Sequence, residues 1–172
     1  MKNRGMDIKH PKLRRVAELQ FMLRAVEKEL HWNKPWGEVM PYDFVVEHEG
    51  QFAWVQVKST MFKDRGGYSS TVRGSDGPYE GDPFEYLAAY IFQEDSWYII
   101  PGEMVVGQGS IALYPQLKGA KYGPYKEAWH LLRRATPKPV RVDWIQGCAE
   151  EIFPQRVSWG ERIRRGLRGG TS

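Results

Sequence analysis

Cysteine, histidine and long apolar runs are scarce in this chain of 172 residues, and each scarcity excludes a class of protein. Cys148 is the single cysteine, so no disulfide can form within the chain, as is typical of a reducing compartment. The four histidines lack the ligand spacing of a zinc site. No apolar run approaches the roughly 20 residues that span a bilayer, and the N-terminus lacks the apolar stretch of a secretory signal. We therefore expect a cytoplasmic protein without a membrane segment.

Two further motifs are missing from the chain. There is no glycine-rich loop ending in Lys-Ser or Lys-Thr, which argues against a nucleoside triphosphatase. Lys58 and Ser59 are adjacent, but neighbours on a strand point to opposite faces, so they do not form a Ser-Lys catalytic pair.

Positive charge is concentrated at the two ends of the chain, although the net charge is only +4. Residues 1–15 hold six basic residues against one acid, and residues 159–172 hold four arginines against one glutamate. Such a distribution suits a polyanionic partner such as nucleic acid. The length fits one domain. We predict a flexible basic arm at residues 1–11, a folded domain at 12–133 and a basic, aromatic-containing extension at 134–172.

The periodicity of apolar residues predicts an α/β chain, a sheet with helices around it. Residues 12–31 repeat apolar side chains at spacings of three and four, which predicts an amphipathic helix that packs through that stripe. Tyr42–Glu47 and Gln51–Thr60 predict a hairpin, and large groups on both faces of the second strand make it a central strand. The remaining predicted elements are strands at Tyr68–Arg73, Phe84–Phe92, Trp97–Ile100 and Ser110–Tyr114, and a helix at Tyr125–Arg133. The stripe of the first helix is Leu13, Val16, Leu19, Leu23, Val26 and Leu30.

Asp43 and the segment Gln56-Val57-Lys58 form the most informative pattern in the chain. Residues two apart on a strand share a face, so Gln56 and Lys58 point the same way, and the hairpin brings Asp43 near them. A strand lysine by itself usually reaches solvent. A polar pair inside an apolar strand is harder to explain as surface, because buried polar groups have partners.

This cluster has the composition of a metal-dependent phosphodiesterase site. A hard divalent cation prefers oxygen ligands and activates water. Asp43 offers a carboxylate, Gln56 an amide oxygen and Val57 its main-chain carbonyl, while Lys58 can orient the attacking water and offset phosphate charge. Glu18, beside the apolar stripe of the first helix, can add a carboxylate or hold a metal-bound water.

With these residues in place, the sequence resembles the PD-(D/E)XK nuclease superfamily, and within it the endonucleases associated with group I introns and those with Holliday-junction-resolvase-like folds. The resemblance implies a central mixed β-sheet flanked by α-helices, the restriction-endonuclease-like core. It also implies Mg²⁺ or Mn²⁺ at Asp43, Lys58 as the catalytic lysine and Glu18 as the helix glutamate. Asp82 and Glu85 fall where such proteins carry further acids. The resemblance spans residues 12–133, in the stretches Arg15–Leu19, Lys34–Gly37, Tyr42–Val46, Val55–Ser59, Phe84–Pro101 and Tyr122–Leu132.

Gln56 stands where the superfamily usually has Asp or Glu, which removes a negative charge from the metal site. Two hypotheses follow: a metal-dependent DNA endonuclease acting on duplex or branched DNA, or a nucleic-acid-binding module without chemistry on the same fold. A plain interaction domain is a third. Cutting two strands favours a homodimer or homotetramer. The basic residues expected to contact DNA are Arg14, Arg15, Lys34, Lys63, Arg65 and Arg73.

Overall fold

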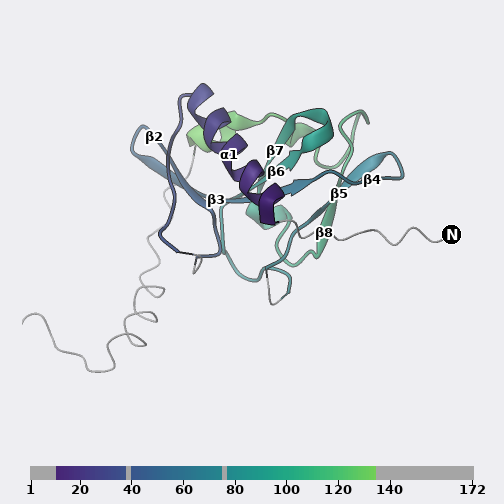
Figure 1. Ribbon diagram of the computed structural model, residues 1–172, viewed down its shortest axis with the longest axis horizontal. Coiled ribbons are helices and arrows are strands. Elements are labelled where there is room, and N and C mark those ends of the chain that lie inside the picture. The colour runs from purple at the N-terminus through teal and green to yellow at the C-terminus, as the bar shows by residue number, and fades with distance from the viewer. Residues whose placement is uncertain (1–10, 38–39, 75–76, 135–172) are drawn as a thin grey trace, which may run out of the picture. The chain divides into compact units, whose positions relative to one another are not determined.

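The computed structural model describes residues 11–37, 40–74 and 77–134. All of these belong to the first of two compact units, Met1–Pro137 and Lys138–Ser172. Apart from their inner ends, the predicted basic arm (1–11) and extension (134–172) lie outside the described residues. A mixed five-stranded sheet carries α1 (Pro11–Glu27) on one face and a second, three-stranded sheet on the other (Figure 1). The predicted α/β, restriction-endonuclease-like fold is confirmed. No helix among the described residues is long and apolar enough to cross a membrane.

The central sheet has the order β1-β2-β3-β6-β7 and is mixed, because β3 pairs with β6 in parallel and every other pair is antiparallel. The middle position of β3 confirms the prediction of a central strand covered on both faces. Along β3, Val55 and Val57 face α1, while Gln56 and Lys58 stand on the opposite face, in register with Leu87 and Ala89. The strands are β1 (His31–Asn33), β2 (Phe44–His48), β3 (Gln51–Thr60), β6 (Tyr86–Ile91) and β7 (Ser96–Pro101).

The second sheet, of order β4-β5-β8, contains the predicted strands Tyr68–Arg73 and Ser110–Tyr114 as β5 and β8, and adds β4, which was not predicted. Its apolar side chains pack on the face of the central sheet that is opposite α1. Its strands are β4 (Lys63–Asp64), β5 (Gly67–Thr71) and β8 (Ser110–Leu113). The described residues therefore form two cores, one on each side of the central sheet.

The helix α1 ends earlier than the predicted residue 31. Glu29 takes up a left-handed conformation with φ of 58°. The N–H of Leu30 then bonds the carbonyl of Ala25, and the N–H of Glu29 bonds that of Val26, both at 2.9 Å. These two bonds are those of a Schellman motif, which satisfies the last carbonyls of a helix. The chain then turns directly into β1, which the sequence did not predict.

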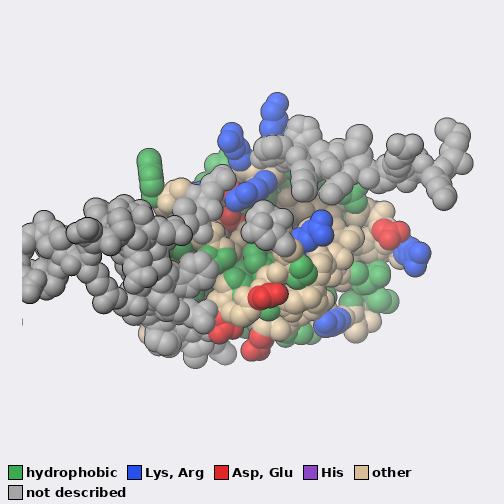
Figure 2. Space-filling view, turned by 90° about the horizontal axis from the view of Figure 1, so that it is seen from below, with side chains coloured by type: hydrophobic (Ala, Val, Ile, Leu, Met, Phe, Trp, Pro, Cys, Tyr) green, Lys and Arg blue, Asp and Glu red, His purple; other side chains and the backbone are tan. Residues whose placement is uncertain are grey.

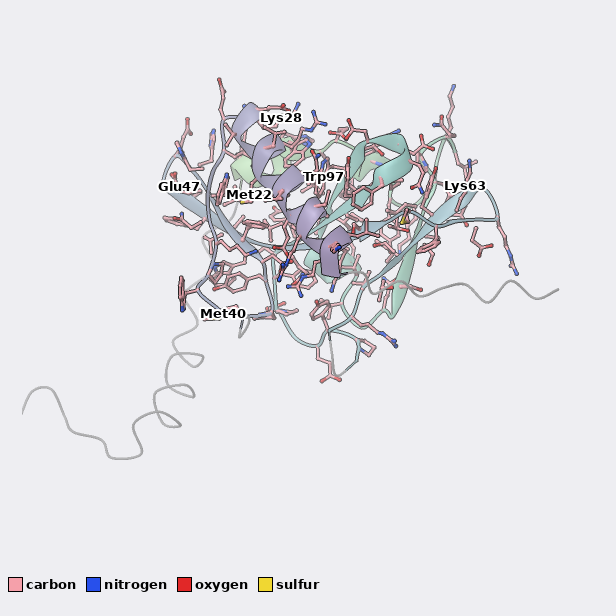
Figure 3. All side chains as sticks on the ribbon, in the orientation of Figure 1. Met22, Lys28, Met40, Glu47, Lys63 and Trp97 are labelled. Carbon is pink, nitrogen blue, oxygen red and sulfur yellow. The ribbon has the colours of Figure 1, made fainter. Side chains whose placement is uncertain are left out.

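The prediction that the apolar stripe of α1 is buried was wrong. Four of its side chains are 41–61% exposed: Val16, Leu19, Leu23 and Val26. The buried face instead carries Ala17, Phe21 and Ala25, which are 0–1% exposed and recur every four residues. Phe21 stacks on Phe44 of β2 and meets the edge of Trp97, which lies beside α1 in Figure 3. Two small residues around one large one let the helix approach the sheet closely, so shape rather than total hydrophobicity selected the face.

Replacing Phe21 with alanine is expected to lower the free energy of unfolding by about 3–5 kcal/mol, because it leaves a cavity among the rings under α1. The matched change Leu19→Ala should cost less than about 0.5 kcal/mol, since Leu19 is 60% exposed. Urea unfolding followed by circular dichroism measures both. Equal losses in the two variants would contradict packing of α1 through Ala17, Phe21 and Ala25.

The predicted helix at Tyr125–Arg133 is also absent. Two short 3-10 helices, Gly123–Tyr125 and Trp129–Arg134, lie there instead. Between them Glu127 is left-handed, with φ of 51°. Its N–H bonds the carbonyl of Trp97 at 2.8 Å, and its carboxylate accepts from the N–H of Trp97 at 2.7 Å and the indole N–H of Trp129 at 2.9 Å. Hydrogen bonds to the open edge of β7 therefore stabilise a non-helical conformation of this segment.

Candidate active site

The candidate site lies where β2 begins beside the middle of β3. Asp43 directly precedes β2, and its N–H bonds the carbonyl of Val55 at 2.9 Å. The pairing of the two strands starts with Phe44 and Val55, so the main chain of Val57 has no residue of β2 opposite it. An unpaired buried N–H is costly, and Asp43 supplies the missing acceptor: its Oδ2 takes the N–H of Val57 at 2.8 Å.

Gln56 completes a cluster of oxygen atoms around this point. Its side-chain nitrogen donates to Asp43 Oδ2 and, at 3.1 Å, to the carbonyl oxygen of Val57. Turning the terminal amide by 180° exchanges its nitrogen and oxygen. Gln56 would then present Oε1 beside the other two oxygens. A carboxylate, an amide oxygen and a main-chain carbonyl suit a hard divalent cation, so the three residues fit the expected metal.

Two cations from other parts of the chain neutralise the acids of the site. Arg14 on α1 bonds Glu18 Oε1 through Nε at 3.0 Å and Asp43 Oδ1 through Nη2 at 3.1 Å. The ammonium of Lys34 pairs with the other oxygen of Glu18. The side chains of Asp43 and Glu18 are only 7% and 8% exposed, whereas Arg14 is 57% exposed. Arg14 therefore lies on the solvent side of both carboxylates.

Burial raises the pKa of Asp43 above its ordinary value, with the charge of Glu18 acting in the same direction. The N–H of Val57 and the guanidinium of Arg14 oppose that rise in the pKa without cancelling it. Ionisation of Asp43 is costly in the free protein. It becomes more favourable when a divalent cation binds, because the cation stabilises the charged form.

Lys58 stands on the same face of β3 as Gln56 but reaches a different neighbour. Its ammonium donates to the main-chain carbonyl of Arg73 at 3.1 Å and lies 5.4 Å from the centre of the Tyr79 ring. Burial lowers the pKa of Lys58, the charge of Asp43 raises it and that of Arg14 lowers it further, with a net decrease. In this state the segment after β5, rather than Asp43, holds the ammonium.

The structure brings four of the predicted site residues together, namely Glu18, Asp43, Gln56 and Val57, with Lys58 beside them. Glu85 lies just before β6, where its carboxylate accepts the N–H of Trp54 at 3.1 Å. Asp82 is exposed in the preceding loop. Among the described residues no group of three or more His, Cys, Asp or Glu side chains could hold a metal. A site here therefore depends on the neutral oxygens of Gln56 and Val57.

The six predicted DNA contacts divide into two groups. Arg14 and Lys34 are paired with the acids of the site. These ion pairs were not predicted, although the four-residue spacing of Arg14 and Glu18 is that of a helical ion pair. The other four side chains are exposed: Arg15, Lys63, Arg65 and Arg73. Lys63 belongs to the β4–β5 hairpin, well away from α1 (Figure 3). Lys and Arg side chains also rise from the upper part of the face drawn in Figure 2, where few acidic side chains are visible.

Comparison with known proteins agrees with this fold and assigns a family. The sequence profile of the PD-(D/E)XK endonuclease family matches residues 12–131. Among solved structures, that of a bacterial homing endonuclease, I-Ssp6803I, aligns with a TM-score of 0.62 and 29% identity, over 72% of this chain and 91% of that one. The comparison with curated proteins found no match. The family profile covers well over half of the sequence and includes every residue of the site, so the chain belongs to the PD-(D/E)XK endonuclease family.

Proposed function

We propose that this protein is a divalent-metal-dependent DNA endonuclease, with Asp43, Gln56 and Lys58 as its catalytic residues and Glu18 in support. The observation that carries the proposal is the convergence of Asp43 Oδ2 and the Val57 carbonyl on the Gln56 amide, next to a lysine on the same face of β3. The membership of the endonuclease family supports the reaction class.

Mg²⁺ or Mn²⁺ would be held by Asp43, the carbonyl of Val57 and the turned amide of Gln56, with Glu18 as a further carboxylate. When bound, the cation supplies Lewis acidity toward the phosphodiester and a water of lowered pKa. The protein contributes the placement of these groups. The central sheet fixes Gln56, Val57 and Lys58 on one rigid strand, and the bond from the N–H of Val57 fixes Asp43.

Lys58 would act on the phosphate and on the attacking water. For this role its ammonium must exchange the Arg73 carbonyl, 3.1 Å away, for a phosphate oxygen. A charged donor preferentially stabilises the transition state, in which negative charge builds on the phosphate, over the ground state. Its half-buried position strengthens that interaction relative to one in water.

The proposed substrate is duplex or branched DNA, which the exposed side chains of Arg15, Lys63, Arg65 and Arg73 would contact at the phosphates. Two strands are cut by two active sites or by two visits of one, so we propose a homodimer or homotetramer. Light scattering coupled to gel filtration measures that state directly. We place the protein in the cytoplasm, on the argument of its single cysteine.

Cleavage of a supercoiled plasmid tests the proposal. Plasmids with and without a cruciform are incubated with protein in Mg²⁺, Mn²⁺ or EDTA. We expect nicked or linear product in at least one metal and none in EDTA, because the site needs a cation to activate water. Dependence on the cruciform would identify branched DNA as substrate.

A second function stays open because Gln56 replaces an acid and lowers the negative charge available to a metal. A nucleic-acid-binding module would shift DNA in a gel, with affinity that falls steeply with salt, and would show no cutting in either metal. To separate this outcome from a rare recognition sequence, the same reaction is run on a plasmid library carrying long random inserts. Binding without cleavage in the library would refute the endonuclease.

A further inference from the structure

Arg14 has a position that a simple DNA-contacting residue would not need. Its guanidinium bridges the two carboxylates of the site, 3.0 Å from Glu18 Oε1 and 3.1 Å from Asp43 Oδ1. The second oxygen of each acid is already taken, in Asp43 by Val57 and Gln56 and in Glu18 by Lys34. Arg14 therefore holds the remaining oxygen of each acid.

The burial of these three side chains shows from which side a cation can approach. Asp43 and Glu18 are almost fully buried, and Arg14 is 57% exposed. A cation that approaches these carboxylates from solvent therefore meets the guanidinium first. Arginine cannot lose its proton at any ordinary pH. The pair must therefore open by rotation of the Arg14 side chain rather than by titration.

We propose that Arg14 is an exchangeable counter-ion of the site: it occupies Asp43 and Glu18 until a divalent cation replaces it, and it then binds a DNA phosphate. The proposal rests on the proposed function, because the displacing cation is the catalytic metal. Two like charges in a nearly buried setting need a cation between them, and Arg14 supplies it in the metal-free protein. Once released, the exposed guanidinium can form a bidentate pair with a phosphate beside the metal.

This arrangement couples metal binding to DNA binding. A guanidinium paired with two carboxylates has its charge offset and its position held by them, so Arg14 contributes little to DNA affinity without metal. With the metal bound it becomes a phosphate contact. Binding of the metal therefore strengthens binding of DNA through Arg14, and binding of DNA strengthens binding of the metal to the same extent.

Metal binding by DNA-free protein tests the first step of the proposal, the displacement of Arg14 by a divalent cation. Mn²⁺ is titrated into wild type and Arg14→Ala by calorimetry or electron paramagnetic resonance. We expect Arg14→Ala to bind Mn²⁺ about three- to tenfold more tightly, because the ion no longer competes with two partly exposed ion pairs. Arg24→Ala is the matched control: Arg24, also on α1, bridges two acids, Glu27 of α1 and Asp95 before β7, and its loss should leave Mn²⁺ affinity unchanged.

Release of Arg14 onto DNA is tested by fluorescence anisotropy of a labelled duplex in a Lys58→Ala background, in which cutting is slow. Arg14→Ala should weaken DNA binding in Mn²⁺ about three- to tenfold and have little effect in EDTA. Equal or weaker Mn²⁺ affinity in Arg14→Ala, or no Mn²⁺ binding in any variant, overturns the counter-ion role. Equal loss of DNA affinity with and without metal overturns the exchange. Tighter Mn²⁺ binding by Arg14→Ala, together with no cleavage of the plasmid library by wild type, would retain the counter-ion and reject the endonuclease.

Discussion

Replacing Lys58 with alanine is expected to lower the rate of plasmid cleavage by about 10²–10³-fold while DNA binding and folding persist. The reason is that Lys58 is the cationic side chain placed beside Gln56 on the rigid middle strand, where charge develops on the phosphate. Its loss removes one electrostatic donor and leaves the oxygen atoms of the metal site intact. Single-turnover cleavage with saturating enzyme isolates this step from binding.

Controls distinguish lost charge from lost packing in this experiment. Lys58→Met keeps the aliphatic stem under the segment after β5 and should be as inactive as Lys58→Ala. Lys121→Ala removes another lysine that lies over a tyrosine ring, that of Tyr122 at 4.9 Å, and should leave the rate unchanged. A Lys58→Met enzyme with wild-type rate would eliminate Lys58 as a catalytic residue.

The lowered pKa of Lys58 adds a pH signature. If the charged ammonium acts on the phosphate, the rate falls as pH rises through that pKa, and this fall begins below the ordinary lysine value. Lys58→Arg, which stays charged, should retain partial activity and lose the alkaline fall.

The arrangement of Asp43, Gln56 and Lys58 was predictable from the sequence because it depends on local geometry. Alternation along one strand fixes Gln56 and Lys58 on a common face whatever the rest of the fold does, and a two-strand hairpin fixes Asp43 beside them. Contacts between distant segments were not predictable in the same way. Lys34 reaches Glu18 across 16 residues, and Arg14 reaches Asp43 across 29.

Two of the wrong predictions, the buried face of α1 and the helix at Tyr125–Arg133, have a common physical origin. In α1 the pattern of hydrophobicity favoured the stripe with Leu19 and Leu23, but the close approach of Phe21 to the rings of the core decided the buried face. At Glu127 helical propensity was overridden by bonds to the open edge of β7. In each case the tertiary partner, which the local pattern does not contain, outweighed a local preference of a few tenths of a kcal/mol per residue.

Replacing Asp43 with asparagine is expected to cause the largest loss of metal binding and cleavage while the protein stays folded. We expect Mn²⁺ affinity to fall by about 100-fold or more, since loss of supporting groups around a metal ligand alone costs 10–100-fold. Cleavage should fall by at least as much. Asparagine is nearly isosteric, and its oxygen can still accept the N–H of Val57, so the start of β2 keeps its bond. Calorimetric titration with Mn²⁺ and single-turnover cleavage measure the two losses.

Stability provides an independent readout of the same substitution. Burial raises the pKa of Asp43 above its value in the unfolded chain, so the folded state binds this proton more tightly. Between the ordinary aspartate pKa and the raised one, ionisation of Asp43 therefore lowers the free energy of unfolding as pH rises, and above the raised pKa that cost is present in full. Asparagine cannot ionise, so Asp43→Asn should remove this pH dependence and be at least as stable as wild type at pH 7. If Asp43→Asn loses both metal binding and stability at pH 7, Asp43 serves mainly to hold β2 and β3 together. If it loses metal binding but keeps its stability, the carboxylate is a metal ligand.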